Sequence, residues 1–204
     1  MIVVKAPSAD LPRRHYEYSD RMSQTKARAV DAAIELLGTR GLHTLTHGKV
    51  DAAAGLPKGS ASNHFRTRES LVRGVVERLE ELDRQDWARI YDVTVASPDH
   101  LVDAVIGFVT AMTTLDRVRT VARYTLAMEA AHNPEVRASL NRGHDRIRAW
   151  SAPILADLGA PDPEAAARTL LAYADGLIMH ALARPEVVEP REQYVRVVRA
   201  CLEP

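Results

Sequence analysis

Polar and charged side chains able to bind nucleic acid crowd into the seven residues from Lys58 to His64. The lysine supplies a positive charge, and the hydroxyl and amide groups beside it both donate and accept hydrogen bonds. Such groups contact base edges and phosphates of duplex DNA, while an alanine methyl packs against the methyl of thymine. The predicted DNA contacts in this segment are Lys58, Gly59, Ser60, Ala61, Ser62, Asn63 and His64.

Three further predicted DNA contacts flank this segment: Thr46, His47 and Arg68. Thr46, with His47 after it, precedes one short helical segment, and Arg68 stands in the first turn of a later helix. The amino-terminal end of a helix is partially positive and binds anions, so its dipole adds to the charge of Arg68. Thr46 and Arg68 are therefore predicted to hold the phosphate backbone rather than to read bases.

The other reactive side chains do not form a catalytic or metal-binding pattern. The sequence contains no HExxH motif, nucleophile elbow or P-loop. Several histidines and acids lie in the second half of the chain without the spacing of metal ligands: Glu129, His132, His144, Asp175 and His180. We therefore predict no enzyme activity, no metal and no cofactor.

Helices are expected to position the polar segment. The sequence is 46% hydrophobic but has only two Phe and two Trp, and its richness in Ala, Leu and Val favours an all-α fold. Gly55 permits a sharp turn between a helix capped by Thr46 and the segment 58–64, and this arrangement predicts a helix-turn-helix. Three residues of the first short helix are predicted to face inward: Val50, Ala53 and Ala54.

The rest of the chain also divides into helical segments. A flexible tail is expected over residues 1–22, then a helix-turn-helix domain over 23–70 and a helical domain over 71–204. Ser23 and Gly41 bound the first predicted helix, and a long helix is predicted from Thr67 to about Val95. Capping residues followed by proline indicate helix starts at 98, 134 and 163. The later helices are expected near 98–114, 117–132, 134–158, 162–184 and 190–203.

Charge and cysteine content restrict which binding partners and which cellular compartment we expect. Residues 1–74 hold 12 Lys and Arg against 7 Asp and Glu, whereas the remaining residues hold 15 against 20. A basic first part suits phosphate binding although the net charge is zero. The single cysteine, Cys201, excludes an internal disulfide, and there is no signal-peptide core or 18-residue apolar run. We expect a soluble, cytoplasmic protein without a membrane partner.

The stretch from Thr46 to Leu71, with the order "AGLPKGS…HF…RESL", resembles the N-terminal signature of the tetracycline-repressor-like (TetR/AcrR) family. The resemblance implies a three-helix DNA-binding domain followed by a helical bundle that binds a ligand and dimerises. It also implies a transcriptional repressor that a small hydrophobic or amphipathic molecule releases from a pseudo-palindromic operator. Ser62 and Asn63 depart from the family, in which a Tyr and a His or Trp are common, so no relative's operator preference carries over.

Large, adaptable side chains in the helical domain predicted over 71–204 are candidates to line the effector cavity that the family resemblance implies. Each of them, taken singly, is also explained as an ordinary core residue. The candidate ligand-binding residues are Trp87, Tyr91, Phe108, Met112, Tyr124, Met128 and Met179.

The last two predicted helices are candidates for dimerisation, because the segment 162–184 is apolar over a wider arc than one surface helix needs. Two such helices from each subunit can form an isologous four-helix interface, and the family resemblance assigns dimerisation to the same two helices. The predicted contacts are Leu170, Ala174, Leu177, Ile178, Ala181, Tyr194, Val198 and Cys201.

Two alternatives stay open from sequence. Within the same class, the chain is an activator, or a constitutive repressor with a vestigial pocket. In a different class, it is a helical ligand-binding or scaffold protein without a role on DNA. Binding to generic duplex DNA that weakens steeply with salt separates a DNA-binding protein from the second class.

Overall fold

Helices make up the regular secondary structure of the computed structural model, which describes residues 13–90 and 95–203, with side chains for 24–83 and 95–203. No strand occurs in these ranges, in agreement with the predicted all-α fold. In chain order the elements are α1 (Arg13–Arg40), the 3-10 turn η1 (Leu42–Thr44), α2 (His47–Ala54), α3 (Ser60–His64), α4 (Arg68–Ile90), α5 (Pro98–Thr113), α6 (Arg117–Glu129), α7 (Pro134–Asp157), α8 (Pro163–Ala183) and α9 (Arg191–Leu202).

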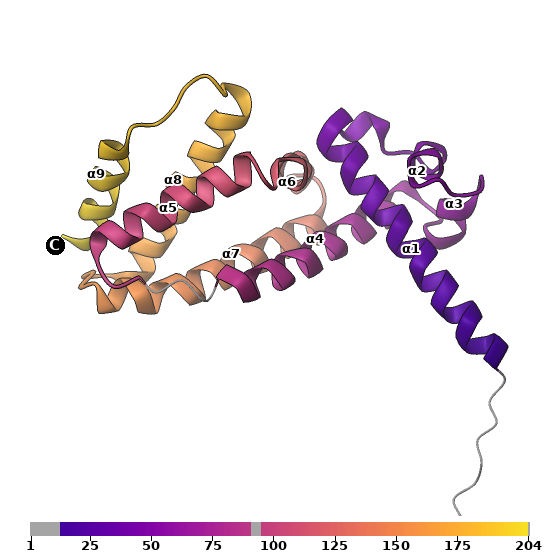
Figure 1. Cartoon of the computed structure of the whole chain (residues 1–204), viewed down its shortest axis with the longest axis horizontal. Coiled ribbons are helices and arrows are strands. Elements are labelled where there is room, and N and C mark those ends of the chain that lie inside the picture. Colours follow the sequence, from indigo (N-terminus) through magenta and orange to yellow (C-terminus); the bar gives the residue numbers. More distant parts are fainter. Residues whose placement is uncertain (1–12, 91–94, 204) are drawn as a thin grey trace, which may run out of the picture.

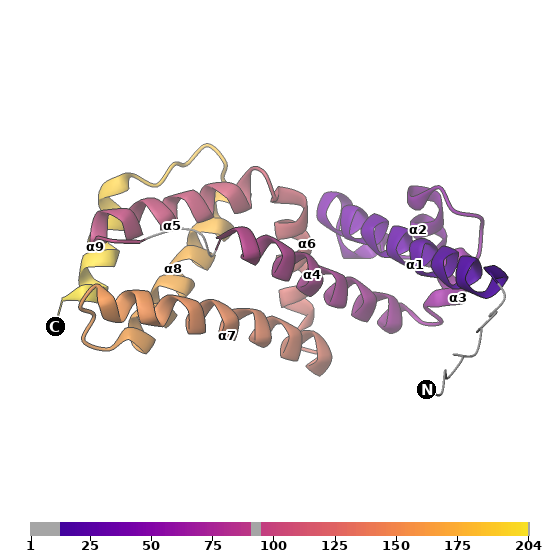
Figure 2. The same ribbon diagram turned by 60° about the horizontal axis from the view of Figure 1, so that its bottom comes forward.

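The first three helices form a head at one end of an elongated molecule, and the helices from α5 onward form the body (Figure 1). α4 extends from the head into the body and runs alongside α7 (Figure 2). Phe65, only 4% exposed, lies in the core beneath the head, and the ammonium of Lys26 on α1 is 5.8 Å from its ring centroid. Phe65 thus fixes the end of α3 against α1.

Two hydrophobic cores hold these parts together. The first lies among α1, α2, α3 and α4 and continues into α6 through Ala122 and Leu126. The second lies among α5, α7, α8 and α9, with the fully buried Leu155 and Val198 among its members. Because α6 belongs to the core of the head, the head and the body are joined by packing as well as by the chain.

Side-chain capping explains where three of the body helices, α5, α7 and α8, begin. Ser97, Asn133 and Asp162 each accept hydrogen bonds from backbone N–H groups in the first turn of α5, α7 and α8, and a proline follows each of them. These local signals placed the three starts correctly. α1 differs, because it begins at Arg13 whereas a flexible tail was predicted up to residue 22. The segment 13–22 contains no Pro or Gly that would interrupt a helix.

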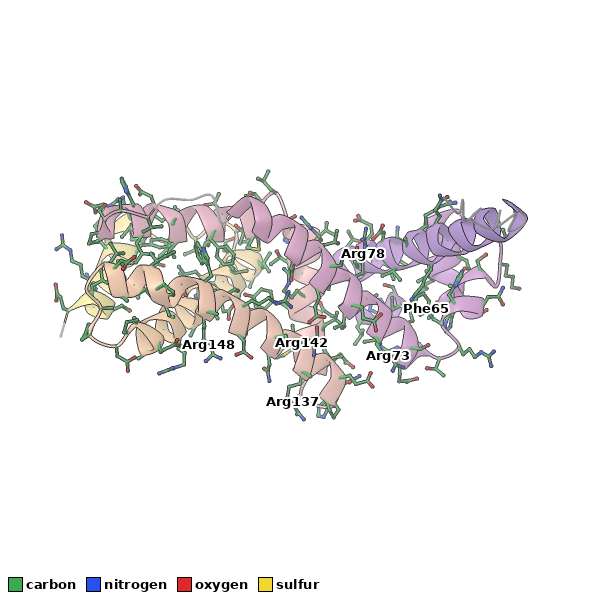
Figure 3. The ribbon with its side chains drawn as sticks, turned by 90° about the horizontal axis from the view of Figure 1, so that it is seen from below. Phe65, Arg73, Arg78, Arg137, Arg142 and Arg148 are labelled. Carbon is green, nitrogen blue, oxygen red and sulfur yellow. The ribbon has the colours of Figure 1, made fainter. Side chains whose placement is uncertain are left out.

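Arginines tie α4 to its neighbours on both sides. Arg78 donates to Asp31 of α1 at 2.8 Å and to Glu81 at 2.9 Å. On the body side, Arg142 of α7 donates to Glu80 at 2.9 Å. Figure 3 shows Arg73 and Arg78 between Phe65 of the head and Arg142 of the body. These pairs are partly exposed and contribute little stability singly, but they set the position of α4 between the two parts.

Candidate DNA-binding site and ligand cavity

The turn between α2 and α3 depends on two glycines with positive φ. Gly55 ends α2 with φ 61° and ψ 37°, and Gly59 precedes α3 with φ 93°. Residues with a Cβ rarely adopt this left-handed region, so these positions favour glycine. Arg28 of α1 donates to the carbonyl of Ala54 at 2.7 Å and so satisfies the end of α2. The predicted helix-turn-helix is therefore present, although α3 begins at Ser60 rather than at Lys58.

A buried carboxylate that the sequence analysis missed fixes the angle between the two helices. Asp51 of α2 is 4% exposed, and its two oxygens accept hydrogen bonds from the N–H groups of Gly59 and Ala61, both at 2.7 Å. These are among the backbone groups that the start of a helix leaves without partners. In the sequence Asp51 is simply an acid in α2, nine residues before Ser60, where α3 begins.

We expect Asp51→Ala to destabilise the head by about 2 kcal/mol, because the buried N–H of Ala61 loses its acceptor. Asp51→Asn keeps one acceptor oxygen, so its free energy of unfolding should lie between those of the native protein and Asp51→Ala. Denaturant unfolding measures the loss, and hydrogen exchange at the amide of Ala61 locates it. Protection of that amide equal to the native protein would contradict the role of Asp51.

Most predicted DNA contacts lie at the surface of the head. Ser60 and Ser62 use their hydroxyl protons on the carbonyls of Pro57 and Gly59, at 2.7 and 2.9 Å, which leaves the oxygens free to accept. The backbone N–H of Lys49 donates to the side chain of Thr46 at 3.4 Å, as expected of a cap. The exposed members of the set are Thr46, Lys58, Ser62, Asn63 and Arg68, and the partly exposed ones are His47, Gly59, Ser60 and His64.

Two predictions for this region are wrong. Ala61 is 0% exposed because it packs into the head core, so its methyl cannot reach thymine. Ala53 is exposed, whereas Val50 is buried as predicted. The inward face of α2 contains Asp51 in place of Ala53, because the carboxylate has backbone partners there.

The body contains two adjacent cavities, which we call the polar lobe and the apolar lobe. The polar lobe, about 200 Å³, lies among α4, α5, α6, α7 and α8, and the apolar lobe, about 340 Å³, lies among α5, α7 and α8. Five side chains line both lobes and so form their common boundary: Phe108, Ala111, Met112, Ile147 and Leu171. An apolar pocket with a few polar groups is typical of small-molecule sites.

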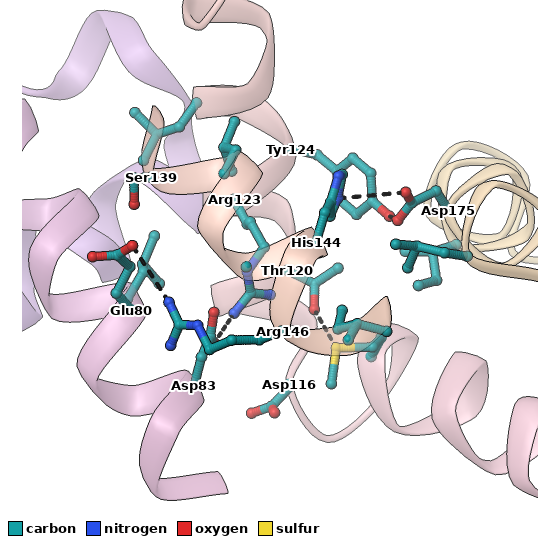
Figure 4. Close-up of a pocket in the computed structure, with 18 of the residues that line it drawn as sticks. Glu80, Asp83, Asp116, Thr120, Arg123, Tyr124, Ser139, His144, Arg146 and Asp175 are labelled. Carbon is teal, nitrogen blue, oxygen red and sulfur yellow. Dashed lines mark hydrogen bonds and ion pairs between the residues drawn. The ribbon is translucent and has the colours of Figure 1, made fainter. Parts of the chain in front are cut away.

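Ion pairs and hydrogen bonds organise the polar lobe (Figure 4). Burial alone would raise the pKa of Glu80, but hydrogen bonds from Arg142 and Ser139 bring the pKa of this carboxyl below its ordinary value. Tyr124 donates its phenol proton to Asp175 at 2.8 Å. Burial first, and then the charge of Asp175, raises the pKa of Tyr124 well above its ordinary value, so this phenol stays protonated.

The structure brings some of the predicted ligand residues to this cavity and others away from it. Phe108 and Met112 line both lobes, and Tyr124 lines the polar one. Met128 is 70% exposed and Met179 is 46% exposed, and neither lines a lobe, because each projects from the outer side of its helix. The predicted residues Trp87 and Tyr91 lie outside the described side chains.

The predicted dimer contacts are mostly inside the chain's own core. The wide apolar arc of α8 is covered by α5, α7 and α9 of the same subunit, so these side chains are not available to a partner. Ala181 and Cys201 are partly exposed. The buried members are Leu170, Ala174, Leu177, Ile178, Tyr194 and Val198.

Neither a metal site nor a membrane span is found in the part of the chain that the structure describes. No three His, Cys, Asp or Glu side chains there are grouped to hold a metal ion. No described helix is both long and apolar enough to cross a bilayer.

Comparison with known proteins places the fold in a family. Residues 29–75 match the model of the tetR family of bacterial regulatory proteins, and residues 96–204 match the tetracyclin repressor-like C-terminal domain. No curated protein matches the sequence.

Solved structures share the whole fold at low sequence identity. A putative transcriptional regulator from Saccharomonospora viridis, solved in complex with choline, is 18% identical with a TM-score of 0.71, over 87% of this chain and 95% of that one. A putative transcriptional regulator from Streptomyces coelicolor A3(2) is 23% identical with a TM-score of 0.69, over 89% and 99%. The multidrug binding protein EbrR, complexed with imidazole, is 24% identical with a TM-score of 0.65, over 88% and 95%.

The family of the C-terminal model covers more than half of the chain, and the model of the DNA-binding part covers the helix-turn-helix described above. The family and the fold are those of transcription regulators rather than enzymes. The chain therefore belongs to the tetR family of bacterial regulatory proteins and is a DNA-binding transcriptional regulator.

Proposed function

We propose that this regulator is a homodimeric repressor that a small hydrophobic or amphipathic molecule releases from a pseudo-palindromic operator. The observation that carries the proposal is that three side chains, Val76 and Leu79 of α4 and Leu126 of α6, belong to the core beneath the head and also line the polar lobe. A molecule that moves these side chains must repack the core on which the DNA-binding helices lie. The ligand cavity and the core of the head therefore share these side chains.

Such sharing supports a mutual effect of ligand and DNA. If the ligand favours a position of α4 and α6 different from the one that DNA favours, each weakens binding of the other by the same factor, typically equivalent to about 1–3 kcal/mol. In a dimer, a small tilt of both heads changes the distance between the two recognition helices. That distance must match a DNA repeat of about 34–36 Å or a multiple of it. Similar structures solved with choline, imidazole and ethidium support a small organic ligand.

We place the dimer contact on the outer face of α8, because the inner face is already covered. The outer face is exposed and consists mainly of small side chains, and such residues let two helices approach closely. It is formed by Thr169, Ala172, Gly176, Met179, His180 and Ala183. An isologous contact through this face uses the same element that the family resemblance assigned to dimerisation, but different residues.

Selection of bound sequences from random duplex DNA tests the function directly, because an enriched motif with two-fold symmetry is expected. On that operator, Lys58→Ala should lower affinity by about 1–3 kcal/mol if the lysine reads a base, and it should leave thermal stability unchanged because Lys58 is exposed. Arg137→Ala is the matched control, since it removes an exposed cation from α7 in the body (Figure 3).

Three results decide between the functions. Weakening by Lys58→Ala but not by Arg137→Ala supports the α3 end of the head as the DNA-binding surface. Equal affinities for both variants and the native protein would remove Lys58 from that surface. Failure to enrich any sequence, together with binding that is insensitive to salt, would favour a protein without a role on DNA.

A further inference from the structure

We infer that the effector is an elongated organic cation whose charged group pairs with Asp175 and whose apolar part fills the apolar lobe. This inference rests on the proposed function, because it names the chemical class of the molecule that the cavity takes. It is carried by the distribution of charge in the polar lobe and by the side chains that the polar and apolar lobes share.

Among the described side chains, Asp175 is the carboxylate of the polar lobe that has no arginine or lysine partner within 4.0 Å. The other three lobe carboxylates have arginine partners: Glu80 pairs with Arg142 at 2.9 Å and Arg146 at 3.5 Å, Asp83 with Arg123, and Asp116 with Arg119. Within the described side chains, the partners of Asp175 are a phenol and an imidazole, and no Lys or Arg nitrogen lies within 4.0 Å of it. A partly buried carboxylate favours a cation in this position.

The two partners of Asp175 hold it in place without neutralising it. Tyr124 of α6 stays protonated and donates at 2.8 Å. His144 of α7 lies with its Nε2 3.7 Å from the other oxygen and is charged only when protonated. The side chain of Asp175 is 34% exposed, so an incoming group can reach it. Figure 4 shows the carboxylate beside the rings of Tyr124 and His144. Aromatic faces also attract organic cations, and both Tyr124 and Phe108 line this lobe.

The position of Asp175 on α8 directs an attached chain toward the apolar lobe. Leu171 precedes Asp175 by about one helical turn and lines both lobes, and Ala167 and Ala174 line the apolar one. Along α5 the apolar lobe extends from Leu101 to Met112, about 16 Å at 1.5 Å per residue. A molecule with its charge at Asp175 therefore has space for a long apolar group beyond Leu171.

An anionic head group finds a weaker site here. Arg123 is engaged by Asp83, and Arg146 contacts both Glu80 and the carbonyl of Arg142, at 3.5 and 3.2 Å. Arg142 is 57% exposed, so water screens its charge. Binding an anion through these arginines would leave Glu80 or Asp83 without its partner in a half-buried lobe, which is unfavourable.

Calorimetric titration of the full-length protein without DNA tests the ligand class. The probes are decyltrimethylammonium, decanoate and decanol, each below its aggregation limit, at pH 8, where histidine is generally neutral. We expect the cation to bind at least tenfold more tightly than the anion and the alcohol. Tetramethylammonium should bind at least a hundredfold more weakly than the decyl compound, since each buried methylene contributes about threefold to fourfold.

Two variants in the same lobe separate the charge of Asp175 from the overall charge of the cavity. Asp175→Asn keeps an acceptor for Tyr124 but removes the negative charge. It should lower the affinity for the cation by about tenfold, whereas the affinity for decanol should change by less than twofold. Asp116→Asn removes a charge that is already paired with Arg119, and it should change the affinity for the cation by less than threefold.

Each outcome bears on one claim. Tighter binding of decanoate, absence of binding by all probes, or equal effects of the two variants would overturn the inference. Binding as expected, with operator affinity unchanged when the cation saturates the protein, would leave the ligand class standing and contradict the proposed release from DNA.

Discussion

The Gly176→Glu variant is expected to sediment as a monomer and to lose operator affinity by a hundredfold or more. Gly176 is exposed on α8, and a Cβ built on it meets nothing within 4 Å in the subunit. The subunit itself thus tolerates a side chain there. In a dimer through the outer face of α8, two glutamates would enter the closest part of the contact and be buried without partners.

The loss on DNA follows from the linkage of two heads. Two linked DNA-binding modules bind more tightly than one module by a factor of about 10²–10⁴, and a monomer loses this gain in affinity. Sedimentation velocity gives the assembly state, and titration of the selected operator gives the affinity. Ala149→Glu is the matched control, because it places the same side chain on an exposed position of α7 and should leave both values unchanged. An intact Gly176→Glu dimer would remove the outer face of α8 from the interface.

Local signals in the sequence predicted the helices and their starts because they act over a few residues. Ser97, Asn133 and Asp162 cap neighbouring N–H groups, and the proline after each can only begin a helix there. Gly55 likewise marked the turn, because the positive φ that this turn needs is a local property of glycine. Residues 13–22 lack both a strong apolar period and a breaker, so their helix was missed.

The same local reasoning failed for several side chains whose role depends on what covers them. The apolar arc of α8 was recognised correctly, but its width does not tell whether a helix of the same subunit or a partner packs on it. Leu177 and Ile178 proved to be covered by the subunit itself. A charged residue at either position is therefore expected to unfold the subunit rather than only to separate a dimer.

Tertiary contacts also decided which polar and adaptable residues matter. Asp51 reads as a surface acid on a short helix until the N–H groups of Gly59 and Ala61 are brought to it. Met112 and Met128 are the same residue type on neighbouring helices, yet the first lines the cavity and the second is exposed. Residue type alone suggested equal roles for the two methionines, but they differ because Met112 lies on the face of its helix toward the cavity and Met128 on the face toward solvent.

Gly38→Ala is expected to lower the melting temperature, although alanine is the better helix former. A Cβ on Gly38 would lie 2.1 Å from the carbonyl oxygen and 2.7 Å from Cγ1 of Val118, so α1 and α6 must move apart. Overpacking of this kind costs about 1–3 kcal/mol, and about 2–4 °C is lost per kcal/mol in a protein of this size. Gly143→Ala is the control, because Gly143 lies within α7 with nothing within 4 Å of its Cβ position, and it should gain about 0.5–1 kcal/mol.

The opposite signs of these two glycine substitutions isolate the contact between α1 and α6 from helix propensity. This contact joins the head to a helix that lines the polar lobe, so it lies on the route from ligand to DNA in the proposed function. Parting the helices should therefore also reduce the factor by which a bound ligand weakens operator binding, a factor obtained from affinities with and without saturating decyltrimethylammonium. A melting temperature raised in both variants would show that α1 and α6 yield easily at Gly38, and coupling would then have to pass through α4 and the Arg78–Asp31 pair.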